Sequence, residues 1–131
     1  MRPNPHNRPL SPHLQIYALH RFTSFTSVMH RATGIVSSIG MVFVTIWLAS
    51  AASSESAYLA FNRFFSNPFI VLCMFIWTGC LCYHFCNGIR HLSWDIGKNL
   101  EIASSWRAAK MVMIGAVVMN LTLWIILSLV A

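Results

Sequence analysis

His84 is the residue of this sequence whose type and surroundings point most directly to chemistry. It lies in the stretch 64–89, which contains no charged side chain, and its two ring nitrogens need partners in so apolar a setting. Two interpretations stand: a hydrogen bond to a neighbouring helix, or ligation of a metal or a haem iron. Gly88 follows one helical turn later and His91 about two turns later, on the same face. A glycine there either gives a flat macrocycle room to approach or lets two helices pack closely.

A second group of polar residues lies near the start of the first long apolar stretch, at Ser24, Ser27, His30 and Arg31. Ser27, His30 and Arg31 are spaced i, i+3 and i+4, so they share one face of a helix. Such donors can hydrogen-bond a quinone carbonyl oxygen and raise its electron affinity. The alternative is a snorkelling arginine beside serines that cap the helix. If both stretches cross a membrane, the two groups of polar residues are expected at the same depth in it. This permits contact between them but does not establish it.

A haem with two axial imidazoles needs them on opposite sides of one iron. His84 and His91 lie roughly 10 Å apart along one helix, on one side of it, so they cannot both bind one iron. His30 could oppose His84, but it is expected near the membrane surface, and a histidine from another chain is the simpler second ligand. A haem bound by His84 would then lie at a subunit interface. Arg90 and His91 would reach the membrane surface, where a haem propionate or a lipid headgroup could lie.

The elements that must position these residues follow from the composition. The chain has 131 residues, of which 56% are hydrophobic and only 9% are charged, whereas soluble domains carry about 25% charged residues. So few charges cannot cover a surface in water, and lipid is the natural solvent. The net charge of +6 comes from basic residues that flank apolar stretches, which membrane topology explains better than a nucleic-acid partner. We predict one small domain over residues 1–131.

Three uncharged stretches are long enough to cross a membrane, at residues 32–54, 64–89 and 111–131. Each reaches the roughly 20 residues that a helix needs to span the hydrocarbon core. Only helices and closed barrels satisfy the backbone in lipid. The sequence therefore predicts an all-α membrane protein with transmembrane helices at about 24–52, 67–95 and 105–130, after an N-terminal cytoplasmic segment of residues 1–23. Gly97 is expected to end the second helix.

The basic residues predict the orientation of the chain. Between the first two spans there is only Arg63, whereas the other basic residues precede the first span or lie from the end of the second span to the start of the third. The positive-inside rule therefore places the N-terminus and the second loop in the cytoplasm or matrix, and the C-terminus on the opposite side. Aromatic residues suit an interfacial belt on that far side: Trp47, Tyr58, Phe61, Phe64 and Phe65. The basic residues on the near side are Arg2, Arg8, Arg21, Arg31, Arg90, Lys98, Arg107 and Lys110.

The start of the chain bears on the cellular compartment, whereas the cysteines do not. The N-terminal segment lacks the short apolar core and the small-residue cleavage site of a secretory signal, and it is too proline-rich for a good transit peptide. We expect the bacterial inner (cytoplasmic) membrane, with the mitochondrial inner membrane as the alternative. The cysteines of the second span have no CxxC or zinc-like spacing, so we interpret them as small packing residues. They are Cys73, Cys80, Cys82 and Cys86.

Three blocks of residues carry a resemblance to a known family. They are Arg8-Pro-Leu-Ser-Pro-His-Leu-Gln-Ile-Tyr17, Ser27-Val-Met-His-Arg-Ala-Thr-Gly34 and His84-Phe-Cys-Asn-Gly-Ile-Arg-His-Leu-Ser-Trp-Asp95. In this order, and with three spans over nearly the whole chain, they resemble the cytochrome b556 subunit of succinate dehydrogenase (respiratory complex II). The combination of S-x-x-H-R-x-T-G with H-x-x-x-G-I-R-H is specific, and either half alone would be weaker.

The resemblance implies one of two small membrane anchors that hold a flavoprotein subunit and an iron–sulfur subunit at the membrane. Succinate would be oxidised outside this chain, and electrons would pass to a quinone at the anchor interface. By the same resemblance, His84 is an axial ligand of haem b, shared with the second hydrophobic anchor subunit. Ser27 and Arg31 are expected to line the quinone site. His30, Arg31 and His91 are expected near the haem propionates, and Asp95 either joins a proton route or is a solvated charge at a helix end.

Three other functions fit parts of this pattern. The anchor of a fumarate reductase would have the same fold, because the direction of the reaction depends on cofactor potentials that lie largely outside this chain. A non-redox structural membrane anchor would need neither His84 nor Arg31. A transporter or channel subunit is disfavoured, because the chain has three spans without an internal repeat and little polar lining outside the cytoplasmic third.

Overall fold

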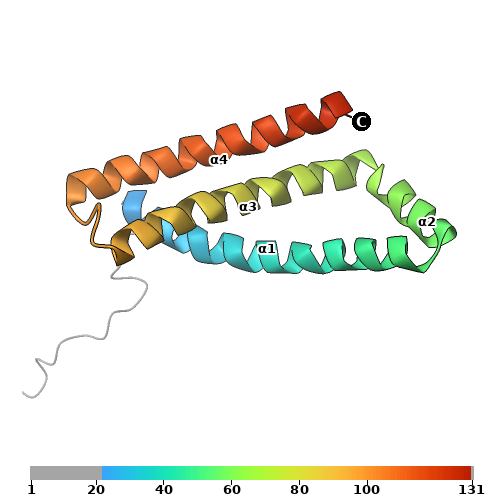
Figure 1. Cartoon of the computed structure of the whole chain (residues 1–131). Helices are drawn as coiled ribbons and strands as arrows, with labels where there is room; N and C mark the ends of the chain where they lie inside the picture. The colour runs from blue at the N-terminus through green and yellow to red at the C-terminus, as the bar shows by residue number, and fades with distance from the viewer. Residues whose placement is uncertain (1–21, 131) are drawn as a thin grey trace, which may run out of the picture.

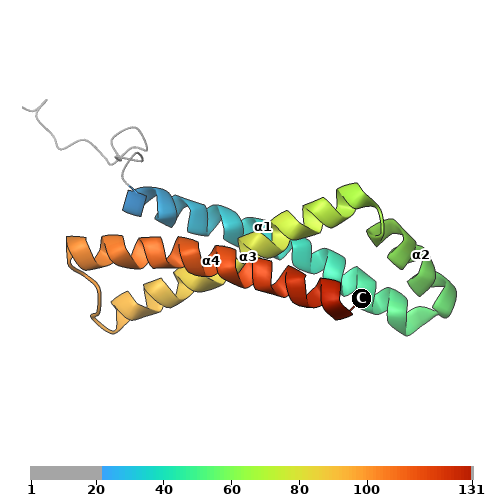
Figure 2. The ribbon, with the colours of Figure 1, turned by 90° about the horizontal axis from the view of Figure 1, so that it is seen from above.

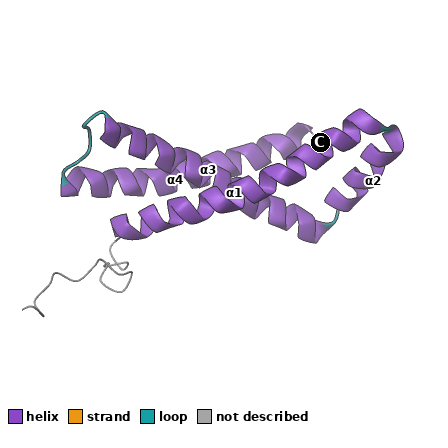
Figure 3. Cartoon of the chain, turned by 90° about the horizontal axis from the view of Figure 1, so that it is seen from below, coloured by secondary structure: helices purple, strands orange, loops and turns teal. Residues whose placement is uncertain are grey.

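The computed structural model describes residues 22–130 and forms four α-helices in this range (Figure 1). They are α1 (Phe22–Ser53), α2 (Glu55–Phe65), α3 (Pro68–Asp95) and α4 (Ile102–Val130). The helices α1, α3 and α4 are each long and apolar enough to cross a membrane, and the described residues contain no strand (Figure 3). The predicted all-α fold with three transmembrane helices is confirmed. Most of the predicted N-terminal segment, residues 1–21, and Ala131 lie outside the described residues.

Helix α3 is the central element of the bundle. It packs against α1 on one side and α4 on the other (Figures 1 and 2). The start of α1, the end of α3 and the start of α4 lie together at one end of the bundle, and α2 lies at the other (Figure 1). Phe22 and Val130 are therefore at opposite ends, as an odd number of spans requires. Most large apolar side chains of the long helices are exposed, which suits a surface that contacts lipid.

Helix α2 lies between two predicted spans, where the sequence analysis predicts only an aromatic belt. Ser54 caps its N-terminus by accepting a hydrogen bond from the backbone N–H of Ala57 at 3.2 Å. Glu55 lies in its first turn and Arg63 in its last. A negative charge at the N-terminus and a positive charge at the C-terminus both interact favourably with the helix dipole. Trp47 on α1 donates to the side chain of Asn62 at 3.3 Å and ties α2 back to the bundle.

The turn after α3 confirms the expectation that Gly97 ends this helix. Gly97 has a φ of 76°, a conformation that costs glycine little. Its N–H donates to the carbonyl of Trp94 at 2.8 Å, and the N–H of Lys98 donates to the carbonyl of Ser93 at 2.8 Å. These two bonds form a Schellman motif, which satisfies carbonyls at the end of α3. The chain is thereby turned towards α4 at the end of the bundle where the polar residues gather.

The three long helices are joined by small residues and polar contacts away from that end. Gly40 of α1 lies so close to the indole of Trp77 on α3 that a methyl group at this position would overlap with the ring. Between α3 and α4, the amide of Asn120 accepts from Thr78 at 2.8 Å and donates to the backbone carbonyl of Phe75 at 3.3 Å. Trp124 donates to the hydroxyl of Thr78 at 2.9 Å.

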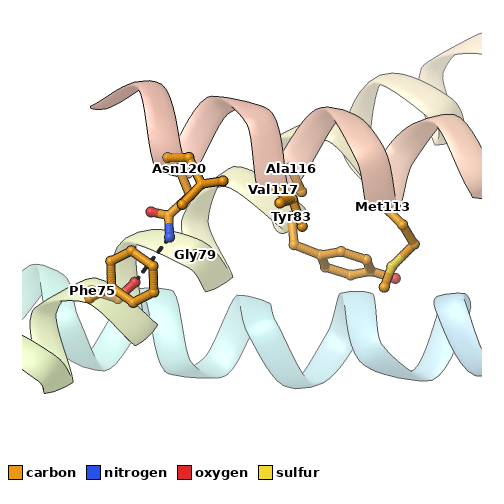
Figure 4. Close-up of a pocket in the computed structure, with 8 residues that line it drawn as sticks. Phe75, Gly79, Tyr83, Met113, Ala116, Val117 and Asn120 are labelled. Atoms are coloured by element: carbon orange, nitrogen blue, oxygen red, sulfur yellow. Dashed lines mark hydrogen bonds between the residues drawn. The ribbon is translucent and has the colours of Figure 1, made fainter. Parts of the chain in front are cut away.

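A mostly apolar groove of about 310 Å³ lies beside these contacts, between α3 and α4 (Figure 4). Asn120 faces it from α4, and its side chain is already hydrogen-bonded to α3. The groove therefore offers no free polar group for chemistry. Its lining residues are Phe75, Gly79, Tyr83, Met113, Ala116, Val117, Asn120 and Leu121.

Candidate functional site

The imidazole of His84 is held in one orientation by the backbone of α1. Its Nδ1 lies 3.0 Å from the backbone carbonyl oxygen of His30. Because a carbonyl oxygen only accepts, Nδ1 donates this bond, and in the neutral imidazole Nε2 is then the nitrogen with a free lone pair. A hydrogen bond from Nδ1 to a carbonyl is the usual support of a histidine that binds a metal through Nε2.

Three imidazoles meet at this point, from two helices. The rings of His30 and His84 are stacked with centroids 4.0 Å apart and an interplanar angle of 7°. The ring of His91 lies 4.8 Å from that of His30. The polar groups of α1 and α3, which were expected at the same depth, are therefore in direct contact. No group of His, Cys, Asp and Glu side chains among residues 22–130 has the arrangement of a metal-ion site.

Glycines provide the room for this stack. A Cβ atom at Gly34 would lie 3.0 Å from Cε1 and 3.4 Å from Nδ1 of His84, closer than a side chain normally packs. The absence of a side chain at Gly34 thus lets the His84 ring lie against α1. Gly88 is less crowded, because the nearest atom to its Cβ position would be Cε1 of His30 at 4.0 Å.

The residues present fit a haem held from one side only. His84 has the fixed Nδ1 bond and the unprotonated Nε2 that axial ligation requires. His30 cannot be the opposite ligand in this arrangement, because its ring lies on the face of the His84 ring. Two axial imidazoles instead point at the iron with their edges from opposite sides. The buried Nδ1 of His30 has no hydrogen-bond partner among the described residues, so this ring retains an unused polar atom beside His84.

The other predicted site residues lie at the same end of the bundle. Ser27 is half-buried on α1, and Arg31 is exposed one turn later; the side chains of both make no hydrogen bond to the part of the chain that the structure describes. His91 is half-buried, with its Nε2 3.5 Å from the amide nitrogen of Asn87. Asp95 is the exposed last residue of α3. The structure thus brings His30, His84 and His91 into one cluster and leaves Ser27, Arg31 and Asp95 without a direct bond to it.

Arg90 corrects a sequence-based expectation. It was expected at the membrane surface, beside a headgroup or a haem propionate, but only 3% of its surface is exposed. Its guanidinium donates to Thr26 of α1 at 3.2 Å, to Asn87 of α3 at 3.3 Å and to Ser105 of α4 at 3.1 Å. It also lies 4.2 Å from the ring centroid of Trp94. Arg90 therefore joins all three long helices from inside the bundle.

Thr26 is the residue on which this internal network converges. It is fully buried, and its backbone carbonyl accepts from the hydroxyl of Tyr83 at 2.8 Å and from the amide of Asn87 at 3.4 Å. Tyr83, Asn87 and Arg90 are spaced i, i+4 and i+7 on α3, so a row of polar residues was visible in the sequence. Their common partner on α1, Thr26, which directly precedes Ser27, cannot be identified from spacing within α3.

The chain is similar to known proteins over most of its length. Residues 4–125 match the family described as succinate dehydrogenase/fumarate reductase transmembrane subunit. The succinate dehydrogenase cytochrome b556 subunit of Paracoccus denitrificans is 38% identical over 115 residues, covering 86% of this chain and 86% of that protein. The b556 subunit of Rickettsia typhi is 34% identical over 118 residues, covering 90% and 91%. The cytochrome b560 subunit of Marchantia polymorpha is 37% identical over 102 residues, covering 74% of each chain. The chain therefore belongs to the family of succinate dehydrogenase/fumarate reductase transmembrane subunits.

Proposed function

We propose that this chain anchors a succinate dehydrogenase in the membrane, supplies one axial ligand of haem b through His84, and forms part of the quinone-reduction site through Ser27 and Arg31. The observation that carries the proposal is the bond from Nδ1 of His84 to the backbone of His30, in the space left by Gly34. It presents Nε2 as a ligand. The dicarboxylate chemistry would take place on other subunits of the complex.

The haem would supply one-electron transfer within the membrane when it is bound. His84 would hold it from this chain, and an imidazole of the second anchor subunit would hold it from the other side. The stacked ring of His30 keeps the His84 ring from rotating. His30 and His91, with Arg31, would face the propionates, which suits their place at the end of the bundle where α1 starts and α3 ends.

Ser27 and Arg31 would position the quinone. The hydroxyl of Ser27 would donate a hydrogen bond to one quinone carbonyl oxygen, and the charge of Arg31 would stabilise negative charge that develops there on reduction. Both side chains are free to bind a ligand, since neither is hydrogen-bonded to the described part of the chain. Reduction to the quinol also takes up two protons. Water would deliver them at this end of the bundle, where Asp95 is exposed.

The complex would consist of this chain, a second hydrophobic anchor, an iron–sulfur subunit and a flavoprotein subunit. We place the start of α1 and the loop between α3 and α4 on the cytoplasmic side of the bacterial inner membrane. This end carries Arg31, Lys98, Arg107 and Lys110, whereas the opposite end carries Arg63. Such an asymmetry follows the positive-inside rule. The electron-carrying subunits would dock at the cytoplasmic end, next to the quinone site.

The ligand role is tested on the complex purified in mild detergent with its co-purifying subunits. We expect a reduced b-type optical band that is lost in His84→Ala. Phe85→Ala is the matched control, because it truncates an exposed neighbour of His84 on α3 to which the proposal gives no role at the haem or the quinone. An unchanged haem content and spectrum in His84→Ala would rule out the ligand role.

The quinone role is tested on the same preparation. Ser27→Ala and Arg31→Ala should each slow quinone reduction while succinate oxidation with an artificial acceptor stays nearly intact. Ser24→Ala, also a half-buried serine near the start of α1, is the control for Ser27. Normal quinone reduction in both site variants would exclude these residues from the site.

A further inference from the structure

The guanidinium of Arg90 is a buried positive charge without a negative partner among residues 22–130. All three of its hydrogen-bond acceptors are neutral, being two hydroxyls and an amide. The chain has only three acidic residues, and all of them are exposed: Glu55, Asp95 and Glu101. The Nε atom of Arg90 is buried and also has no hydrogen-bond partner among the described residues.

A charge in this position is unfavourable unless something in the assembled protein responds to it. Burial removes the hydration of the guanidinium, and neutral acceptors replace only part of it. A neutral residue of similar length could hold three helices together with less loss of hydration. The retained charge therefore points to an electrostatic role in addition to the structural one. Because the interior of a membrane protein screens poorly, such a charge acts over about 10 Å.

A continuous set of contacts leads from Arg90 to the His84 ring. Arg90 donates to Asn87, whose amide nitrogen lies 3.5 Å from Nε2 of His91. The ring of His91 lies 4.8 Å from the ring of His30, which is stacked on His84 at 4.0 Å. Arg90 and His84 are six residues apart on α3, so their backbones are separated by roughly 9 Å along the helix axis.

We propose that Arg90 is a positioning residue for electron transfer: it fixes a permanent positive charge inside the bundle, and this charge raises the reduction potential of the haem bound at His84. The inference rests on the proposed function. Thr26, Asn87 and Ser105 hold the guanidinium in place, so the charge cannot turn away towards water. A nearby fixed cation favours the reduced form of the haem, which carries one positive charge less than the oxidised form.

Three variants separate the charge from the hydrogen bonds. Arg90→Gln removes the charge and keeps a hydrogen-bonding side chain, whereas Arg90→Lys keeps the charge and loses the planar group. Lys110→Gln is the control, because it removes an exposed cation near the same end of the bundle. The measurement is a redox titration of the b-type band in the purified complex. We expect a lower midpoint potential in Arg90→Gln, and values close to that of the unmodified protein in Arg90→Lys and Lys110→Gln.

Two variants of Ser105 test the same inference if the Arg90→Gln complex does not assemble. Ser105→Asp places a carboxylate where the hydroxyl now accepts from Arg90 at 3.1 Å, and the resulting ion pair cancels the charge. Ser105→Asn has nearly the same shape without a charge. The midpoint potential should fall in Ser105→Asp but not in Ser105→Asn. A potential equal to that of the unmodified protein in Arg90→Gln or Ser105→Asp, with haem retained, would overturn this inference and leave the ligand role of His84 intact. An unmodified complex without a b-type band would overturn both.

Discussion

Replacing Gly40 by alanine tests how α1 and α3 are held together in the middle of the bundle. A Cβ atom at this position would overlap with the indole of Trp77, at the atoms of its five-membered ring. The indole nitrogen is buried without a hydrogen-bond partner among the described residues. No hydrogen bond among these residues therefore fixes the indole nitrogen, and the ring packs against the α1 backbone at Gly40. Either the indole must leave this position or the two helices must move apart.

The expected loss of stability in Gly40→Ala is the difference between two opposing effects. Alanine gains about 1 kcal/mol over glycine in helix propensity. Forcing a group into a close-packed interface costs typically about 1–3 kcal/mol, and a rigid indole in contact with backbone places Gly40→Ala near the upper end of that range. We therefore expect a net destabilisation of about 2 kcal/mol. Gly115→Ala is the matched control, because its Cβ atom would lie at an ordinary distance of 3.5 Å from the sulfur of Cys86.

The assay is thermal denaturation of the purified complex, followed by the intensity of its b-type band. Gly40→Ala should lower the midpoint temperature, and Gly115→Ala should leave it unchanged or raise it. Trp77→Ala removes the ring that would meet the new methyl group, so the double variant Gly40→Ala/Trp77→Ala should be more stable than the sum of the single effects predicts. Equal stability of Gly40→Ala and Gly115→Ala, or simple additivity in the double variant, would refute the close contact.

Two further predictions concern the site itself. Gly34→Ala should weaken haem retention more than Gly88→Ala, because its Cβ atom would press on the His84 ring at 3.0 Å; equal haem content in the two variants after gel filtration would contradict this. Tyr83→Phe removes the hydroxyl that donates to the backbone of Thr26 and should cost about 0.5–1.5 kcal/mol, measured as a lower midpoint in thermal denaturation with an unchanged spectrum.

The three spans were predictable because length and lack of charge are sufficient signals for a transmembrane helix. Helix α2 was not predicted, because its 11 residues are too few to span a membrane and its aromatic residues indicated only an interfacial belt. The cap formed by Ser54 followed by Glu55 was the available local signal. It is weak alone, because the same residues also favour turns.

The candidate site was predictable as a set of residues but not as an arrangement. Spacing placed His84 and His91 on one helix face and His30 at the same depth, yet the stacking of His30 on His84 depends on how α1 is rotated against α3. Periodicity within one helix carries no information on that rotation. Arg90 was placed wrongly for a related reason: a basic residue near the end of a span usually reaches the headgroups. The neutral acceptors that hold Arg90 inside the bundle lie on α1 and α4, and the sequence of α3 carries no information on them.

Those inward contacts also explain why polar residues matter to the geometry of this bundle. In lipid, apolar side chains gain little by leaving the hydrocarbon, so hydrophobic burial scarcely selects one rotation of a helix over another. Close approach at small residues and hydrogen bonds must select it instead. The bonds from α3 to Thr26 fix the start of α1 in rotation and height, one residue before Ser27 and four before His30. The backbone carbonyl that accepts from His84 is therefore positioned by the same contacts that bury Arg90. Substitutions at Thr26 should consequently alter the positions of both the proposed haem ligand and the proposed quinone site.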